Sequence, residues 1–148
     1  MTDIRLREVE PADLETFFQH ESDVGAARMV GFTSREREPF MTHWNTKVLG
    51  NPENFVRAVL VDGELAGNIL SWRQDGRRHL GYWFGREFWG RGVAGRGLEL
   101  FLAELGERPL YAEALETNTG SRRLLERRGF TTTGDVNGDG YVTYVLEA

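Results

Sequence analysis

An alternation of apolar and polar residues predicts a series of β-strands along the chain. Residues 4–9 alternate in this way and are expected to form a strand with one buried face. Residues 55–61 and 65–72 flank Asp62-Gly63, a dipeptide typical of a tight β-hairpin turn. The pattern returns in four later segments, at residues 79–84, 110–115, 130–136 and 141–146. The last two flank another glycine-rich turn and are expected to form a closing hairpin.

Apolar residues three or four positions apart predict helices in the first third of the chain. One helix is expected to start after Pro11 and to bury Leu14, Phe17 and Phe18. Residues 23–33 contain two glycines and mixed polarity, and they are interpreted as a loop.

A second helix is expected to follow this loop. Ser34 is its candidate N-cap, although Arg37 stands where a capping box needs an acidic residue or glutamine. Acidic residues in the first turn are therefore the only support for this start. Phe40 and Trp44 share the apolar face, and the stop signal at residues 50–52 ends the helix.

Two more helices are expected in the second half of the chain. Residues 90–97 form a glycine-rich turn that leads into an amphipathic helix ending near Leu105. Residues 118–128 form the last helix, which Gly129 stops. The order is β-α-α-β-β-β-α-β-α-β-β, in which antiparallel meanders flank one βαβ unit. We expect a single α/β or α+β domain over residues 1–148, with a mixed, mostly antiparallel sheet of about seven strands.

Composition and charge narrow the function classes. The chain has 148 residues, of which 40% are hydrophobic and 28% charged, as is usual for one soluble domain. The absence of cysteine excludes disulfides, thiolate metal sites and a cysteine nucleophile. The three histidines lack metal-binding spacing, so no metal is expected. The net charge of -5 argues against a nucleic-acid partner. No apolar segment is long enough for a membrane partner, and the cytoplasm is the expected location.

The arginines are unevenly distributed and form two clusters in the sequence. One cluster lies in the middle of the chain and one later: Arg77, Arg78, Arg86, Arg91 and Arg96, then Arg122, Arg123, Arg127 and Arg128. A locally basic region in an acidic chain suits a small anionic ligand better than a polyanion.

The glycine-rich turn at residues 90–97 is the strongest candidate for an anion site. The first N–H groups of a helix have no intrahelical acceptor, and the helix dipole adds a partial positive charge there. Glycine lets the backbone approach a diphosphate closely, and Arg86, Arg91 and Arg96 could add side-chain charge. The same glycines could serve chain reversal alone, although four of them exceed what a turn needs.

Residues 90–95 also match the G-x-G-x-x-G pattern of dinucleotide-binding folds. Glu113 and Glu116 lie near the spacing at which such folds place a ribose contact. The context argues against this interpretation, because only about fifty residues remain for the further βα units that the fold needs.

Three motifs follow one another in the second half of the chain. Residues 80–84 and Phe88 lead into Trp89-Gly90-Arg91-Gly92-Val93-Ala94, and a block over residues 118–130 contains Asn118, Ser121 and Gly129-Phe130. Together these motifs resemble the GNAT acetyltransferase family. Trp89 departs from the Gln or Arg of the wider family but is usual in the branch that resembles ribosomal-protein N-terminal acetyltransferases of RimJ/RimL type. The resemblance covers residues 55–147, whereas residues 1–54 match only in their layout.

The resemblance implies an enzyme that transfers an acetyl group from acetyl-CoA to a primary amine, on a small molecule or a protein N-terminus, by direct attack in a ternary complex. It places pantetheine in a gap between the strands at residues 81–84 and 111–115, and it makes the N–H of Trp83 or Phe84 the donor to the thioester carbonyl. It also allows a homodimer. The cofactor-binding residues that it implies are Tyr82, Trp83, Phe84, Trp89, Gly90, Arg91, Gly92, Val93, Ala94, Gly95, Asn118 and Ser121.

The resemblance leaves the proton transfers more open. Many members protonate the thiolate with a tyrosine at the position that is Leu125 here, and Ser121 is the expected catalytic substitute. Ser121 and Asn118 are equally compatible with an ordinary helix start. His79 is the leading base candidate, because a neutral imidazole accepts a proton near pH 7, although a surface histidine and a mechanism without a base fit as well. Lesser candidates are Glu113, His20 and Glu21.

Two further interpretations stay open. Phe32, Phe40 and Trp44 could cover the acceptor pocket, although their spacing is more typical of core residues. The vacant acid position at Leu125 is compatible with a non-catalytic acyl-CoA-binding sensor or scaffold. A dinucleotide-binding enzyme is the third hypothesis.

Overall fold

The computed structural model describes residues 2–25 and 35–147. The predicted N-cap Ser34 and the predicted roof residue Phe32 lie outside these ranges, as does most of the predicted loop. At its start, Val24 and Gly25 are already helical, so the loop prediction is wrong for these two residues.

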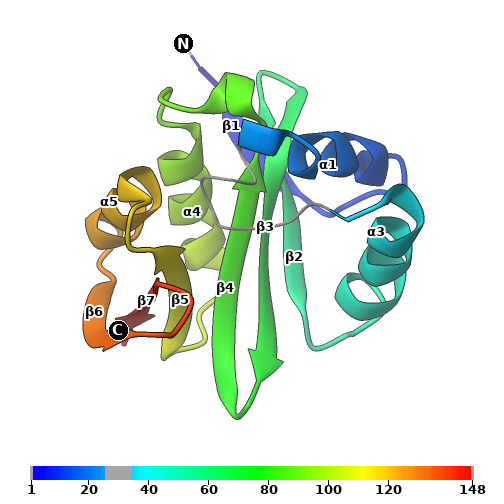
Figure 1. The fold of residues 1–148 in the computed structure, drawn as a ribbon. Coiled ribbons are helices and arrows are strands. Elements are labelled where there is room, and N and C mark those ends of the chain that lie inside the picture. The colour runs from blue at the N-terminus through cyan, green and yellow to red at the C-terminus, as the bar shows by residue number, and fades with distance from the viewer. Residues whose placement is uncertain (1, 26–34, 148) are drawn as a thin grey trace.

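The described residues form one seven-stranded sheet, which confirms the expected fold class and element order (Figure 1). The strand order is β1-β2-β3-β4-β5-β7-β6, and every neighbouring pair is antiparallel except β4 and β5. The strands are β1 Ile4–Arg7, β2 Phe55–Val61, β3 Glu64–Gln74, β4 Arg77–Phe84, β5 Leu110–Leu115, β6 Thr131–Val136 and β7 Tyr141–Leu146.

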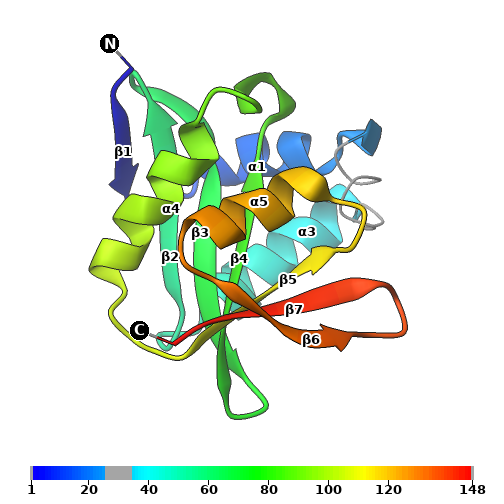
Figure 2. The ribbon, with the colours of Figure 1, turned by 90° about the vertical axis from the view of Figure 1, so that its left-hand side faces the viewer.

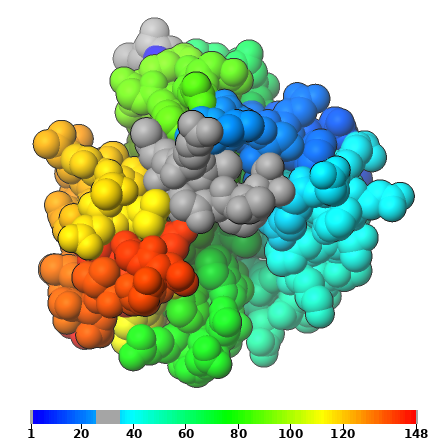
Figure 3. Space-filling model, viewed as in Figure 1, coloured from blue at the N-terminus to red at the C-terminus, as the bar shows by residue number. Residues whose placement is uncertain are grey.

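The helices cover both faces of the sheet. Helices α4 and α5 lie on one face, and α1 and α3 lie on the other (Figures 1 and 2). In the space-filling view, α5 and the β6–β7 hairpin lie on one side of the molecule and α1 and α3 on the opposite side (Figure 3). The helical elements are α1 Asp13–Glu21, α3 Arg37–His43, the π-helix η1 Trp44–Val48, the short 3-10 helix η2 Arg86–Phe88, α4 Val93–Glu104 and α5 Thr119–Arg127. No helix in the described ranges is long and apolar enough to cross a membrane.

Two helix starts differ from the sequence-based predictions. Helix α3 begins at Arg37, and its N-cap position is Glu36, whose extended backbone precedes the helix without a capping hydrogen bond from its side chain. Helix α4 begins at Val93, inside the predicted glycine-rich turn. Residues 93–97 of that turn are therefore already helical.

The β2–β3 hairpin forms where the sequence predicts it. Asp62 and Gly63 have φ values of 50° and 84°, the positive range that a type I′ turn requires at both of its central residues. Asp75 and Gly76, with φ values of 54° and 75°, join β3 to β4 in the same way. These two tight turns keep β2, β3 and β4 in adjacent positions and fix the register of β4, the strand that forms one wall of the site.

Two apolar clusters hold the helices on the sheet. The larger one packs α4 and α5 on the sheet and includes Leu98, Phe101 and Leu125, each fully buried. The smaller one packs α1 and α3 on the other face and includes Phe40 and Trp44, which are 1% and 5% exposed. Phe40 and Trp44 are therefore core residues, and the alternative that they roof an acceptor pocket is not supported.

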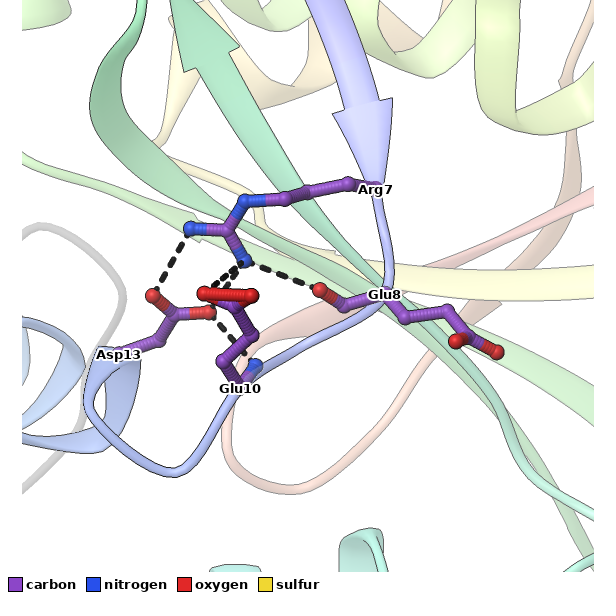
Figure 4. Close-up of polar contacts among 4 residues, drawn as sticks. All are labelled: Arg7, Glu8, Glu10 and Asp13. Atoms are coloured by element: carbon purple, nitrogen blue, oxygen red, sulfur yellow. Dashed lines mark hydrogen bonds and ion pairs between the residues drawn. The ribbon is translucent and has the colours of Figure 1, made fainter.

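A buried ion pair joins the end of β1 to the start of α1 (Figure 4). The Arg7 guanidinium donates to both carboxylate oxygens of Asp13, at 2.6 and 2.9 Å, and the Glu10 N–H donates to the same carboxylate at 2.8 Å. Burial alone would raise the pKa of Asp13, but these three hydrogen bonds and the Arg7 charge together lower it. Asp13 therefore stays ionised and orients α1 against the sheet.

Candidate functional site

The candidate site lies where β4 and β5 separate. These parallel strands pair only at Arg78–Leu110, His79–Tyr111 and Leu80–Ala112. Beyond Leu80, β4 continues to Phe84 without a β5 partner, while its other edge stays paired to β3. Figure 2 shows the consequence, because β6 and β7 run across the direction of β1 to β4. The splayed gap that the resemblance implies is thus confirmed.

A cavity of about 460 Å³ extends from this gap to the N-termini of α4 and α5. Its walls come from β4, the loop before α4 with the first turn of that helix, and one face along the length of α5. The lining residues are Tyr82, Trp83, Phe84, Phe88, Trp89, Gly90, Gly92, Val93, Ala94, Gly95, Asn118, Gly120, Ser121, Arg123, Leu124, Arg127 and Arg128. All of the predicted cofactor-binding residues except Arg91 are in this set.

The loop before α4 presents its backbone to the cavity. Gly90 and Gly92 have φ values of 72° and 75°, and a Cβ added to either would meet no atom within 4 Å. Their conformation therefore favours glycine, and the open space beside them is part of the cavity. Helix α4 starts directly afterwards, with its first backbone hydrogen bond from Arg96 N–H to the Gly92 carbonyl. The N–H groups of Val93, Ala94 and Gly95 precede this bond and have no intrahelical acceptor.

The three arginines that the sequence places near this loop turn away from the cavity. Arg91 packs over the Phe88 ring, with its guanidinium carbon 5.4 Å from the ring centroid. Arg96 pairs with Glu99, and Arg86 pairs with Asp23. Their side chains therefore contribute no charge to the cavity lining.

Arginines of the second cluster supply the positive charge instead. Arg123 and Arg127 line the cavity without an ion-pair partner among the described residues, and Arg128 lines it while it pairs with Glu99. The clustering of arginines at residues 122–128 was visible in the sequence, but the face of α5 that points at the glycine loop was not. Phe88, Gly120 and Leu124 also line the cavity. They lie within or beside the motifs but were not among the predicted cofactor-binding residues.

The N-terminus of α5 holds two predicted site residues. The Asn118 side-chain oxygen accepts a hydrogen bond from the Ser121 N–H at 3.2 Å, so Asn118 is the N-cap of α5 and also lines the cavity. The Ser121 hydroxyl forms a 2.6 Å hydrogen bond with the hydroxyl of Tyr82 across the gap. Leu125 is fully buried in the apolar core and cannot supply a polar group.

The edge of β4 offers backbone donors to the cavity. The Gly85 N–H bonds to the Ala66 carbonyl of β3 at 2.9 Å, and N–H groups alternate sides along an antiparallel strand. The N–H of Phe84 therefore points away from β3, into the gap, whereas that of Trp83 points toward β3. The Phe84 carbonyl also turns from β3, since it accepts a 3.1 Å hydrogen bond from the Trp89 indole.

His79 lies outside the cavity. Its ring stacks on Trp72 at 5.7 Å between centroids, and its Nε2 is 3.3 Å from the Gln74 carbonyl oxygen. Tyr82 is three residues further along β4, so a separation of about 10 Å follows from strand geometry. At that distance a base would have to act through water.

His20 lies closer to the end of β4. Its ring packs on Gly85, where an added Cβ would meet Nε2 at 2.6 Å, and its Nδ1 is buried without a hydrogen-bond partner in the described residues. Burial lowers the pKa of His20, against an opposing effect of Glu87, so the imidazole is neutral near pH 7. His20 and Glu87 also line a second cavity of about 550 Å³, beside Arg86 and Glu64.

The remaining acidic candidates are engaged elsewhere. Glu21 pairs with Arg35 at 2.8 Å, and Glu113 is exposed beside the amide of Asn137. Within the described ranges, no group of three or more possible ligand side chains is arranged to hold a metal ion.

Comparison with known proteins identifies the family to which this geometry corresponds. A family model described as an acetyltransferase (GNAT) domain matches residues 3–131. A search of curated protein sequences finds no significant match.

Solved structures share the fold over nearly the whole chain. A probable acetyltransferase, 26% identical, superposes with a TM-score of 0.72 over 97% of this chain and 92% of that one. The aminoglycoside acetyltransferase AAC(6')-Ib in complex with coenzyme A is 17% identical, with a TM-score of 0.78 over 98% and 95% of the two chains. RimL, a ribosomal alpha-N-protein acetyltransferase in complex with coenzyme A, is 18% identical, with a TM-score of 0.77 over 97% and 93%.

Proposed function

Because the chain belongs to the GNAT acetyltransferase family, we propose that it transfers an acetyl group from acetyl-CoA to a primary amine. The observation that carries the proposal is the continuous cavity from the glycine loop to the gap between β4 and β5. A long donor with an anionic end and a thioester end fits such a cavity. The backbone of the glycine loop can bind the anionic end, and the unpaired edge of β4 can bind the thioester end.

The anionic end of the donor binds at α4. The pyrophosphate lies on the N–H groups of Val93, Ala94 and Gly95, where the helix dipole adds a partial positive charge. Arg123 and Arg127 are the free cations of this cavity in the described part of the chain, and they neutralise further phosphate charge.

The reactive end of the donor lies between β4 and α5. The pantetheine amides bond to the free edge of β4 and to the Asn118 side chain. The Phe84 N–H, which points into the gap, polarises the thioester carbonyl and stabilises the oxyanion formed when the amine attacks. Ser121 donates to the departing sulfur at the N-terminus of α5.

The acceptor is a primary amine on a small molecule or on a protein N-terminus. Two of the structural relatives in complex with coenzyme A carry the names of an aminoglycoside acetyltransferase and a ribosomal-protein acetyltransferase, so both acceptor classes belong in one assay panel. Thiol release from acetyl-CoA across aminoglycosides, polyamines and N-terminal peptides measures this activity. Binding of acetyl-CoA without turnover on any acceptor would favour a sensor or scaffold, and binding of NAD(H) without coenzyme A would contradict the proposal.

The cofactor assignment is tested with a matched pair of variants. Gly92→Glu and Gly92→Ala carry the same backbone strain at φ 75°, but only glutamate places a negative charge in the phosphate position. Calorimetric titration of coenzyme A is expected to show no binding to Gly92→Glu and measurable binding to Gly92→Ala. Equal affinities in the two variants would contradict a pyrophosphate site at this loop.

A further inference from the structure

Tyr82 and Ser121 join the two walls of the cavity by their side chains. The residues lie 39 positions apart, on β4 and in the first turn of α5, and their hydroxyl oxygens are 2.6 Å apart. Both line the cavity at the level where β4 has lost its β5 partner. This hydroxyl pair is a direct polar side-chain link between β4 and α5.

The distance alone is compatible with either hydroxyl as the donor, and the chemistry of the two groups favours Tyr82. Burial raises the pKa of Tyr82 to about 12, although the Ser121 hydrogen bond acts to lower it. Tyr82 therefore keeps its proton at neutral pH. A phenol is the stronger donor of the two groups, and a serine oxygen has two acceptor lone pairs. The Tyr82 O–H accordingly donates to Ser121 Oγ, and the Ser121 proton is left to point elsewhere.

Ser121 is also fixed through its backbone and its helix. Its N–H is held by the Asn118 side chain at 3.2 Å. The same helix is tied to β7 by Tyr144, whose hydroxyl accepts from Arg122 at 2.9 Å and donates to Glu126 at 2.9 Å. With its backbone held and its oxygen accepting from Tyr82, Ser121 has its own O–H left for the cavity.

We propose that Tyr82 is a positioning residue for acetyl transfer, which turns the Ser121 hydroxyl into a single donor aimed at the sulfur of the departing thiolate. This inference rests on the proposed function. It also accounts for Leu125, which is buried in the core at the position where many members of the family have a tyrosine. In this chain the phenol is that of Tyr82, on the facing strand, and it acts through Ser121.

Neither Tyr82 nor Ser121 gives up its proton in the transfer step. The amine nitrogen bonds to the carbonyl carbon, the C–S bond breaks, and its electron pair goes to sulfur. Ser121 stabilises the thiolate with a hydrogen bond and keeps its proton, because an aliphatic hydroxyl is a far weaker acid than a thiol, whose free pKa is about 8.5. The amine proton goes to water, and the thiolate takes its proton from water. The N-terminal dipole of α5 favours the same negative charge.

A double-mutant cycle tests the proposal. Tyr82→Phe, Ser121→Ala and the double variant are compared with the unchanged protein by kcat and by KM for acetyl-CoA, with Tyr111→Phe as a matched control outside the cavity. Tyr82→Phe is expected to lower kcat about tenfold and Ser121→Ala about a hundredfold, both with little change in KM. The double variant is expected to equal Ser121→Ala, because Tyr82 acts only through that hydroxyl. Tyr111→Phe is expected to keep the full rate.

The possible outcomes separate the two proposals. Losses that multiply in the double variant, or a full rate for Tyr82→Phe, overturn the positioning role while the proposed function stands. A raised KM with unchanged kcat would make Tyr82 a binding residue only and also overturns it. Absence of thiol release by the unchanged protein on every acceptor overturns the proposed function, and this inference with it. Coenzyme A titration of each variant shows whether a lost rate reflects a lost fold.

Discussion

At the scale of single residues, the position of His79 in the structure bears on its rank as the leading base candidate of the sequence. His79 is held between Trp72 and Tyr111, outside the cavity. We predict that His79→Gln keeps kcat within about threefold, because general-base catalysis typically contributes about 100-fold or more and His79 lies beyond direct reach. Steady-state thiol release at pH 7 measures this. A loss of a hundredfold, with unchanged affinity for acetyl-CoA, would instead establish His79 as a base that acts through water.

A second residue-scale prediction concerns the arginines. We predict that Arg127→Ala raises KM for acetyl-CoA about tenfold and leaves kcat unchanged, since it removes a charge-assisted contact made equally in ground and transition states. Arg96→Ala is the matched control, because Arg96 pairs with Glu99 and does not line the cavity. The difference between the variants is expected to shrink at high salt. Equal KM values for both variants would contradict the assignment.

The sequence could predict the local parts of the site and not the parts that join distant segments. The local conformations at Gly92 and Asn118 could be predicted because a loop conformation and a helix cap are properties of a short segment, whereas the role of Asn118 in holding pantetheine is what the family resemblance implies. The Tyr82–Ser121 hydrogen bond depends on how α5 packs across the gap, 39 positions away. Arg91 was predicted to contact the cofactor with its side chain, yet it packs on Phe88, because a long side chain chooses its partners in three dimensions.

At the scale of secondary-structure elements, the junction of β1 and α1 depends on one carboxylate. We predict that Asp13→Asn lowers the free energy of unfolding by about 2 kcal/mol, because it leaves the Arg7 charge with a weaker partner. Urea unfolding followed by circular dichroism measures it. The exposed pair of Arg5 and Asp3 provides a control: Asp3→Asn is expected to change stability by less than about 0.5 kcal/mol. Equal effects of the two substitutions would contradict a structural role for Asp13.

Element boundaries show which physical signals the sequence carries. The strands beside Asp62-Gly63 were predicted closely, because positive φ at both turn residues fixes the hairpin register. The start of α3 at Arg37 was missed, since no side chain caps it and the first turn is stabilised by packing of Phe40 in the core. Tertiary packing of that kind leaves no local signature.

At the scale of the whole molecule, buried His20 and half-buried His43 couple stability to pH. In the folded protein, burial lowers the pKa of His20, and the charge of Glu87 acts in the opposite direction. Burial and the charges of Arg35 and Lys47 lower the pKa of His43, and the charge of Glu21 acts in the opposite direction. Below the unfolded value of about 6.5, the unfolded chain therefore binds more protons than the folded one. The folded protein therefore has its full stability above that pH, where both histidines are neutral, and loses stability as the pH falls. The α1 and α3 side of the sheet is thus the acid-sensitive part of the molecule.

The last prediction follows from this linkage. We predict that the free energy of unfolding decreases between pH 7.5 and pH 5.5, and that His20→Gln weakens this dependence, because glutamine cannot be protonated. At pH 5.5, one unit below the unfolded pKa of about 6.5, His20 can change the free energy of unfolding by at most about 1.4 kcal/mol. Urea unfolding at both pH values measures the slope, with His79→Gln as the control for removal of a half-buried histidine that belongs to neither apolar cluster. If His20→Gln kept the full slope, the neutral imidazole beside Gly85 would not be the group that couples folding to pH.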